Sequence, residues 1–270
     1  MDAVDPLLLY REAVQAPAAE VQFLSRAWAH AHPGWSPTRL REDFAGTAAV
    51  AAAWVALSDD HRAVAVEHDP VVCRRAAELA QDTLGPRAED LLLVEDDVRT
   101  AQTPEVQVVA ALNFSALGFH DASTMGDYLQ AAAAILEPGG VLVLDLFGGP
   151  AAERSSAQSR PITDGPAEGW TYTWRQVSFD PATRRIRCAI DFTSPDGERM
   201  TDAFEYDWRL WPPTELVALA VDHGFADAEI WCDRWDPRAG RSVGRHQPVD
   251  PSELERDDRP DWAAYLVCRT

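Results

Sequence analysis

The sequence predicts a single α/β domain in which helices cover both faces of a mostly parallel sheet. Three observations support this fold class. A chain of 270 residues with 46% hydrophobic side chains is long enough for one large core. Strand-like and helix-like segments alternate over residues 36–147. The strand-like segments, such as VVAAL and VLVLDLF, are apolar throughout, which is typical of parallel strands buried on both faces.

Apolar spacing and turn residues place the elements of the first half. An amphipathic helix is expected over residues 17–31, because apolar side chains recur there every three or four residues between Pro17 and Pro33. Beyond it, strands are expected over 39–44, 63–68, 91–95, 106–114 and 141–147. The helices between them are expected over 48–57, 71–81 and 123–136. Residues 138–140, Pro-Gly-Gly, are expected to form the turn before the fifth strand.

The second half has a different pattern. Residues 150–169 are rich in Pro, Ser and Gly and are expected to form a link. Period-two alternation then predicts antiparallel strands over 170–179, 184–192 and 198–211. A helix over 212–225, a strand over 226–235, a polar loop over 236–260 and a final strand over 261–269 complete the chain. The expected parts of the domain are a helical lid or cap (1–35), a sheet core (36–149), an antiparallel insertion (150–211) and a closing helix and β-hairpin (212–270).

The charge of the chain narrows the class of partner. The sequence has 44 acidic and 24 basic side chains, a formal net charge of -20. Such a charge repels the phosphates of nucleic acids and the anionic surface of membranes, so neither is expected as a partner. No apolar run reaches the roughly 18 residues of a membrane span, and the first residues lack the layout of a secretory signal. A cytoplasmic location is therefore expected.

The four cysteines do not indicate a metal or redox site. They lie far apart, at positions 73, 188, 232 and 268, without a Cys-x-x-Cys or Cys/His spacing. We expect them to be reduced, buried thiols, and we expect no metal.

Four segments with acidic or glycine residues lie at the ends of the expected strands: LREDFAGTA, VAVEHDP, VEDDVRT and LEPGGVLVLDLF. In this order and spacing they resemble the successive motifs of class I S-adenosylmethionine-dependent methyltransferases. The resemblance covers about residues 36–147. It implies a Rossmann-like fold with a mostly parallel seven-stranded sheet, an antiparallel β insertion after the fifth strand, and S-adenosyl-L-methionine as the cofactor.

The loop after the first strand departs from the family pattern. Aligned with acidic-x-Gly-x-Gly-x-Gly, Glu42 takes the acidic position, Gly46 keeps the second glycine, and Phe44 and Ala48 replace the other two. Glycines let the backbone approach a cofactor closely, and a pyrophosphate needs more of that contact than a sulfonium amino acid does, so the lost glycines argue against a dinucleotide. The resemblance implies cofactor contacts from Glu42, Asp43, Phe44, Ala45, Gly46 and Thr47, with both acids at the cationic end.

The following strand ends supply the other cofactor contacts that the resemblance implies. Glu67, followed by His68, would accept hydrogen bonds from the two ribose hydroxyls. Asp97 would accept from the adenine amine and the Val98 amide would face the ring, although Asp96 fits the same register. Asn113 ends the fourth strand beside the methyl group, or instead caps the following turn. The alternative for Glu67 is a solvated glutamate beside a helix start, and the alternative for Glu42 and Asp43 is an acidic strand end that faces solvent.

The substrate side is expected beyond the fourth strand. Phe114 and Ser115 close that strand, and Tyr10 and Gln15 precede the core in a segment that the resemblance makes a lid or, alternatively, a plain capping helix. The insertion adds Tyr172, Trp174, Trp208 and Arg209. Its aromatic side chains fit a cationic amine held by cation–π contacts, or simply pack one sheet face against the core.

His120 is the candidate general base, with an ordinary surface or packing role as its alternative. Methyl transfer from a sulfonium is an in-line displacement that depends mainly on positioning, so no catalytic residue is assigned. The expected function is methyl transfer to nitrogen or oxygen of a small-molecule acceptor in bacterial specialised metabolism, by a monomer or homodimer. The alternatives are a protein that binds S-adenosylmethionine for other chemistry or for regulation, and a nicotinamide-dependent reductase.

Overall fold

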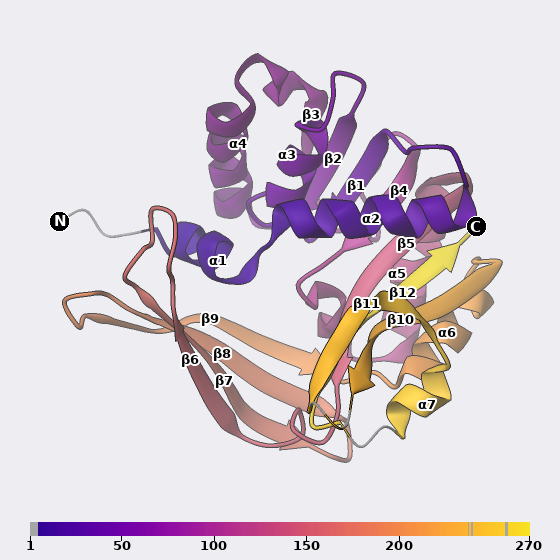
Figure 1. The fold of residues 1–270 in the computed structure, drawn as a ribbon. Helices are drawn as coiled ribbons and strands as arrows, with labels where there is room; N and C mark the ends of the chain where they lie inside the picture. Colours follow the sequence, from indigo (N-terminus) through magenta and orange to yellow (C-terminus); the bar gives the residue numbers. More distant parts are fainter. Residues whose placement is uncertain (1–4, 237, 239, 257–258) are drawn as a thin grey trace.

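The structure is a computed structural model that describes all residues except 1–4, 237, 239, 257 and 258. Within the described residues the core is an eight-stranded sheet of order β11-β10-β12-β5-β4-β1-β2-β3 (Figure 1). Its parallel strands are β1 (Arg39–Asp43), β2 (Arg62–Glu67), β3 (Leu91–Glu95), β4 (Val106–Ala111) and β5 (Leu136–Gly148). Its antiparallel strands are β10 (Asp227–Asp236), β11 (Arg241–Val249) and β12 (Trp262–Arg269).

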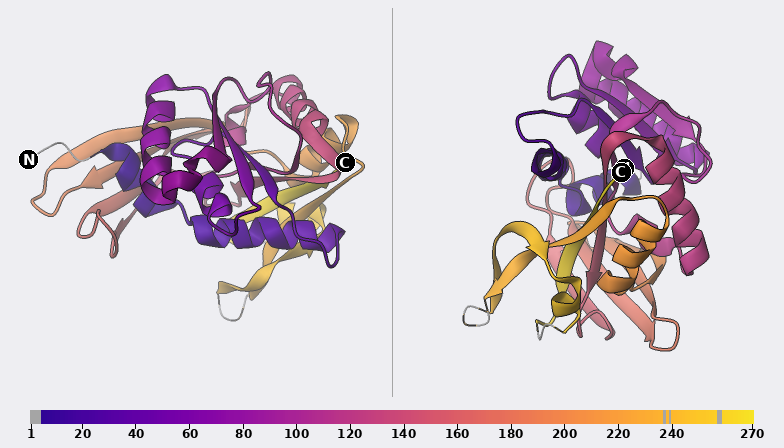
Figure 2. Two further views of the ribbon diagram at one scale, coloured as in Figure 1. Left: turned by 90° about the horizontal axis from the view of Figure 1, so that it is seen from above. Right: turned by 90° about the vertical axis from the view of Figure 1, so that its right-hand side faces the viewer.

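Helices cover both faces of this sheet (Figure 2). Small apolar side chains on β1, β2, β4 and β5 pack on one face with α2 (Pro17–Ala31), α3 (Ala49–Val55) and α4 (Pro70–Leu84). The opposite face packs against α5 (Ala122–Ile135) and α6 (Pro213–Asp222). Consecutive strand residues point to opposite faces, so Val64 and Val66 join the second layer while Ala63 and Ala65 join the first. The sheet is therefore buried on both sides, as its apolar strands predict.

The antiparallel insertion forms a second sheet of order β6-β7-β8-β9. Its strands are β6 (Ser156–Pro161), β7 (Thr171–Asp180), β8 (Arg185–Thr193) and β9 (Arg199–Arg209). The N-terminal helix α1 (Pro6–Val14) packs on it through Leu9 and Ala13, which meet Ile190 and Phe192 (Figure 1). Asp5, which caps α1, accepts a 2.7 Å hydrogen bond from Arg75 on α4. The start of α1 is therefore joined to a helix of the large sheet as well as to the small sheet.

Three local expectations are wrong. The expected loop 236–260 contains β11 and α7 (Pro251–Glu255), and the expected link 150–169 contains β6. Both strands lie at sheet edges, where polar residues are tolerated, so their sequences lack the apolar alternation that predicts a strand. The expected turn at Pro138-Gly139-Gly140 lies inside β5, because Gly139 adopts a φ of +80° and the register against β4 shifts there.

Short 3-10 helices, η1 (Gly85–Asp90) and η2 (Ser115–Gly118), connect α4 to β3 and β4 to α5. No helix in the described part of the chain is long and apolar enough to cross a bilayer.

Candidate functional site

The loop after β1 keeps a glycine-like conformation although two of the three pattern glycines are replaced. Phe44 and Ala48 have φ values of 54°, and Gly46 has a φ of 55°. A left-handed conformation costs a non-glycine residue about 1 kcal/mol or more, so packing must hold Phe44 and Ala48 in place. A Cβ atom on Gly46 would meet nothing within 4 Å, which leaves the space over its backbone open. The loop can therefore receive a ligand against bare backbone at Gly46.

Glu67 joins this loop to the end of the neighbouring strand. Its Oε2 accepts a 3.0 Å hydrogen bond from the Gly46 amide, and its Oε1 accepts from the amides of His68 (2.9 Å) and Asp69 (3.0 Å). β1 and β2 are parallel neighbours, so their carboxyl ends lie side by side. The side chain is 11% exposed. A carboxylate that is fixed by backbone amides and partly open to solvent is suited to accept hydrogen bonds from a diol.

A cavity of about 210 Å³ lies at the ends of β1, β2 and β3. Its lining combines apolar and acidic side chains: Phe44, Val66, His68, Asp96, Asp97, Val98 and Phe119. Arg99 donates a 2.6 Å hydrogen bond to Asp97, and this bond holds the pKa of Asp97 below its ordinary value. Asp96 accepts from the Asp97 amide at 2.7 Å. Both candidates for the adenine contact therefore line this cavity.

Glu42 and Asp43 point to opposite faces of the sheet, and neither is among the described residues that line the cavities of the site. Glu42 accepts a 2.7 Å hydrogen bond from the Ala51 amide of α3 and is 3% exposed. Asp43 is 1% exposed, accepts a 2.7 Å bond from Arg41 Nε and a 3.1 Å bond from the Tyr128 hydroxyl. Burial raises the pKa of Asp43, and the Arg41 guanidinium opposes this rise. Both acids are thus held in internal networks, and their expected place beside the cofactor stays a prediction.

Burial raises the pKa of Glu42 to about 8, and the nearby carboxylates of Glu20 and Asp43 add to the rise. In the unfolded chain a glutamate titrates near 4.3. The folded protein therefore holds the proton of Glu42 more tightly than the unfolded chain does. The stabilisation from this proton is complete below the unfolded pKa and is lost as the pH rises toward the folded pKa of about 8. We expect stability to fall over that window for this reason.

Glu42→Gln is expected to flatten this pH dependence, because an amide oxygen can still accept from Ala51 and carries no charge. The variant should gain about 2–4 kcal/mol of stability relative to wild type between pH 5 and pH 8, at about 1.4 kcal/mol per unit of pKa shift. Urea unfolding at both pH values measures it. Glu205→Gln, an exposed change on β9, is the control. An equal decline in wild type and Glu42→Gln would contradict this assignment.

A second cavity, of about 270 Å³, lies between the large sheet, the small sheet and α1. We call it the chamber. Its lining comes from seven segments far apart in the sequence: Tyr10, Val14, Glu20, Asn113, Phe114, Asp145, Tyr172, Trp174, Ile190, Tyr206 and Trp208. β1 and β4 are parallel neighbours, with Asp43 opposite Ala111, so the loop after β1 lies next to the chamber. A ligand across this loop would reach both cavities.

Asp145 organises the floor of the chamber. Its two carboxylate oxygens accept hydrogen bonds from the backbone N–H groups of Asn113 (2.8 Å) and Phe114 (2.7 Å). Asn113 and Phe114 have φ values of 58° and 61°, so two consecutive residues are held in the left-handed region. Burial raises the pKa of Asp145 to about 8, the two amides oppose the rise, and the Glu20 carboxylate adds to it.

Of the expected substrate-side and catalytic residues, four lie outside the chamber lining. Gln15 accepts a 3.5 Å bond from the Thr47 hydroxyl and so contacts the loop after β1. Ser115 bonds to the Leu112 carbonyl at 2.9 Å, within its own turn. Arg209 binds Glu215 at 2.9 Å and lies over Trp211. The Nε2 atom of His120 lies 2.7 Å from the Asp207 carbonyl, so this histidine braces β9. The catalytic candidate His120 and the substrate candidate Arg209 are thus placed in structural contacts.

Sequence reasoning missed Glu20 and Asp145 as chamber residues. Asp145 had a signal, because it is the only charged side chain in the apolar run VLVLDLF. Glu20 lies in the first turn of α2, where acids are common at helix starts, so nothing in the sequence distinguishes it.

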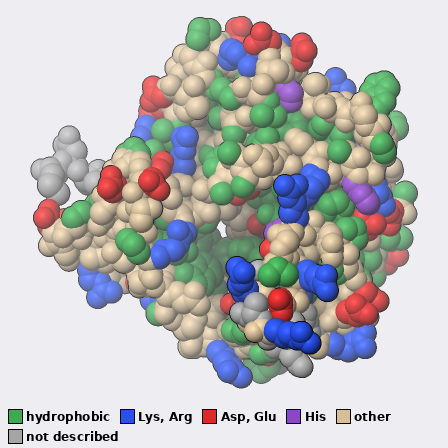
Figure 3. All heavy atoms as spheres, in the orientation of Figure 1, with side chains coloured by type: hydrophobic (Ala, Val, Ile, Leu, Met, Phe, Trp, Pro, Cys, Tyr) green, Lys and Arg blue, Asp and Glu red, His purple; other side chains and the backbone are tan. Residues whose placement is uncertain are grey.

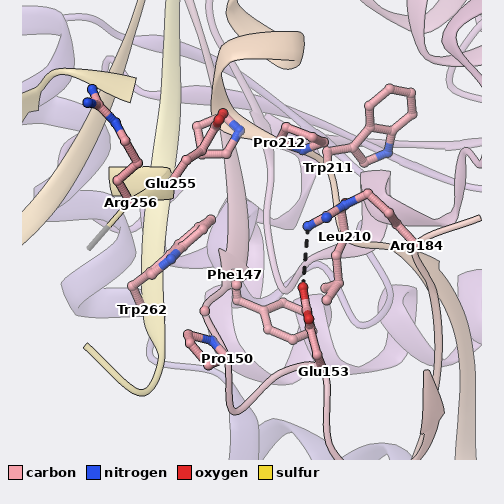
Figure 4. Close-up of a pocket in the computed structure, with 13 residues that line it drawn as sticks. Phe147, Pro150, Glu153, Arg184, Leu210, Trp211, Pro212, Glu255, Arg256 and Trp262 are labelled. Atoms are coloured by element: carbon pink, nitrogen blue, oxygen red, sulfur yellow. Dashed lines mark hydrogen bonds and ion pairs between the residues drawn. The ribbon is translucent and has the colours of Figure 1, made fainter. Parts of the chain in front are cut away.

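Figure 3 shows a hollow between the two layers of the molecule, with hydrophobic side chains in its depth. A groove of about 510 Å³ shares Phe114 and Trp174 with the chamber. A further pocket of about 440 Å³ lies beyond Phe147, where Glu153 and Arg184 form a 3.9 Å ion pair (Figure 4). Phe147 packs on Phe114 with ring centroids 4.7 Å apart, so these two rings separate the chamber from the outer pocket.

The described residues contain no group of three or more His, Cys, Asp or Glu placed to hold a metal. All four cysteines are free thiols; Cys188, Cys232 and Cys268 are buried, whereas Cys73 is half-buried.

No protein-family model and no curated protein matches the sequence. Solved structures, however, match nearly the whole chain. CalS10 from Micromonospora echinaspora, an amino pentose methyltransferase solved with S-adenosylmethionine, is 18% identical, covers 97% of this chain and 95% of its own, and has a TM-score of 0.64. The sugar N-methyltransferase KedS8 from a Streptoalloteichus species is 19% identical, covers 98% of this chain and 94% of its own, and has a TM-score of 0.61. DesVI from Streptomyces venezuelae is 17% identical, covers 97% of this chain and 94% of its own, and has a TM-score of 0.66.

At these identities the likeness shows the fold. The chain has the Rossmann-like class I methyltransferase fold: a mostly parallel sheet with helices on both faces and an antiparallel sheet inserted after β5. The fold class expected from the four motifs is confirmed, with β11 as an additional edge strand in the described chain.

Proposed function

We propose that this protein transfers a methyl group from S-adenosylmethionine to nitrogen or oxygen of a small-molecule acceptor. The observation that carries the proposal is the meeting of the open loop at Gly46 with the Glu67 carboxylate, 3.0 Å apart, between two cavities at the carboxyl ends of the parallel strands. Ligands of open α/β sheets bind at this edge. One cavity suits the cofactor's base and the other suits an acceptor.

The residues at this edge fit the cofactor from end to end. The cavity beside Phe44 and Val98 would hold the adenine, with Asp96 or Asp97 accepting from its amine. Glu67 would accept from the ribose hydroxyls in place of its present amide partners. The amino acid end would lie over Gly46, where a Cβ atom would meet nothing. When bound there, the cofactor supplies an activated methyl group beside Asn113 and the chamber.

The chain's own contribution is to position the acceptor and to exclude water. Asp145 fixes the Asn113–Phe114 turn at the border between cofactor loop and chamber. Tyr10 of α1 closes the chamber and packs on Phe204 of the small sheet, with ring centroids 4.9 Å apart. Holding reactants in line can replace much of the rate that a dedicated base would supply. For this reason the proposal does not depend on His120.

The similar structures support a class of acceptor and a metabolic role for this protein. CalS10 is described as an amino pentose methyltransferase and KedS8 as a sugar N-methyltransferase, both from bacteria. We extend this to a small acceptor in bacterial specialised metabolism. The protein is proposed to act in the cytoplasm as a monomer or homodimer, with α1 and the start of α2 as a lid and without a nucleic-acid or membrane partner.

The test is release of S-adenosylhomocysteine when purified protein is incubated with S-adenosylmethionine and a panel of small amines and phenols. At least one acceptor should raise release above the acceptor-free rate by tenfold or more. Mass spectrometry of the acceptor should show a gain of one methyl group. Cofactor binding without turnover across the panel would favour a regulatory role or other chemistry. Binding of reduced nicotinamide dinucleotide at micromolar concentration would favour a reductase.

A further inference from the structure

The chamber brings two carboxyl groups together from elements far apart in the chain. Glu20 comes from the first turn of α2 and Asp145 from β5, and both line the same cavity of about 270 Å³. The charge of Glu20 adds to the rise in the pKa of Asp145. Two acidic side chains in one partly enclosed cavity favour a cationic ligand, because a bound cation stabilises their ionised forms and a neutral ligand does not.

One of these groups lacks a partner. The Oε2 atom of Glu20 is buried and has no hydrogen-bond partner in the structure. A buried polar atom without a partner costs about 1–3 kcal/mol, and more when it is charged. Glu20 itself lines the chamber, so a donor bound there would approach the same carboxyl group. No described residue supplies that donor.

The walls of the chamber favour a cation as that ligand. Trp208 stacks on Tyr206 with ring centroids 4.3 Å apart, and Trp174 stacks on Trp208 at 5.9 Å. Tyr10 and Tyr172 add two further rings to the lining. Aromatic faces attract ammonium groups, and no Arg, Lys or His is among the described residues that line the chamber. An anionic acceptor would have no counter-charge here.

We infer that the acceptor is a protonated small amine, held between Glu20, Asp145 and the aromatic walls, and that Glu20 takes up its proton before methyl transfer. This inference rests on the proposed function and names the acceptor class. The ammonium gives one proton to Glu20, and its nitrogen gains a lone pair. That pair forms the new C–N bond as the S–CH₃ bond breaks and its electrons remain on sulfur. The product is an N-methylammonium, whose charge favours the ionised form of Asp145.

The size of the chamber sets the kind of amine. A cavity of about 270 Å³ is smaller than most drug-sized sites and accommodates one six-membered ring. The groove next to the chamber shares Phe114 and Trp174 with it. A substituent of the amine reaches this groove only by passing these two rings. The probe of choice is therefore a ring amine with a neutral twin of the same shape.

The test compares cyclohexylamine with cyclohexanol by calorimetric titration at pH 7. A titration with S-adenosylhomocysteine comes first, and the two probes are then titrated into the saturated protein. Cyclohexylamine should bind at least tenfold more tightly than cyclohexanol. Glu20→Gln should abolish that preference while leaving binding of S-adenosylhomocysteine within about twofold, because the amide keeps the size of the side chain and loses its charge.

Glu205→Gln is the matched control, because it removes an exposed carboxylate next to Tyr206 on β9 and should keep the preference. Equal binding of the two probes, binding of neither at 50 mM, or an undiminished preference in Glu20→Gln would overturn the inference. Absence of S-adenosylhomocysteine binding would instead refute the proposed function. Circular dichroism melting of each variant separates a binding defect from a folding defect.

Discussion

Asp43→Ala is expected to lower the free energy of unfolding by about 3–5 kcal/mol, the usual cost of removing one member of a buried ion pair. Arg41 is 2% exposed and lies 2.7 Å from Asp43, so the variant leaves a buried guanidinium without its charged partner. The Tyr128 hydroxyl, 3.1 Å from Asp43, loses its acceptor as well. Urea unfolding at pH 7 measures the change.

Two further variants show whether the orphaned charge causes the loss. The double variant Arg41→Met/Asp43→Leu should recover most of the stability, because an apolar pair of similar volume leaves no buried charge. Glu78→Ala removes an exposed partner of Arg75 and should cost no more than about 0.5 kcal/mol. A cost below 1 kcal/mol for Asp43→Ala would mean that this network does not stabilise the core.

Glu67→Ala is expected to weaken binding of S-adenosylmethionine by about 1.5–3 kcal/mol, a loss of roughly 10- to 150-fold in affinity. The truncation removes the proposed acceptor for the ribose hydroxyls. It also releases the Gly46 amide, which Glu67 holds at 3.0 Å, so the loop after β1 loses its fixed position. Calorimetric titration of both proteins measures the difference.

Glu95 offers a matched control for this variant. It ends β3 opposite Glu67 in the parallel register and is exposed, yet it is not among the residues that line the neighbouring cavity. Glu95→Ala should therefore bind the cofactor within about twofold of wild type. Equal losses in Glu67→Ala and Glu95→Ala would point to a general electrostatic effect of acidic strand ends.

The parallel core was predictable because burial on both faces leaves a mark in the sequence. Runs such as AVAVE and VLVLDLF carry apolar residues on both faces of a strand, and the motif residues follow directly at the strand ends. Parallel strands bring their ends together, so the proximity of Gly46 and Glu67 follows from the order of the segments. The chamber aromatics Tyr172, Trp174 and Trp208 followed from the period of two in the insertion.

The features that the sequence does not show are contacts that depend on partners far away in the chain. The network of Asp43 with Arg41 and Tyr128 joins β1 to α5, and the sequence alone does not show which face of the sheet each acid takes. His120 is fixed by a backbone carbonyl 87 positions away. Glu20 lines the chamber only because the first turn of α2 is placed beside it in the fold. Edge strands β6 and β11 carry polar residues, so their pairing shows only in the folded chain.

The central claim is that this chain binds S-adenosylmethionine at the carboxyl edge of its parallel sheet. Calorimetric titration of S-adenosylmethionine and S-adenosylhomocysteine into the wild-type protein tests it most directly. The account predicts binding of both at micromolar concentration with one site per chain. No heat of binding for either ligand up to millimolar concentration would contradict the account, whatever the likeness of the fold.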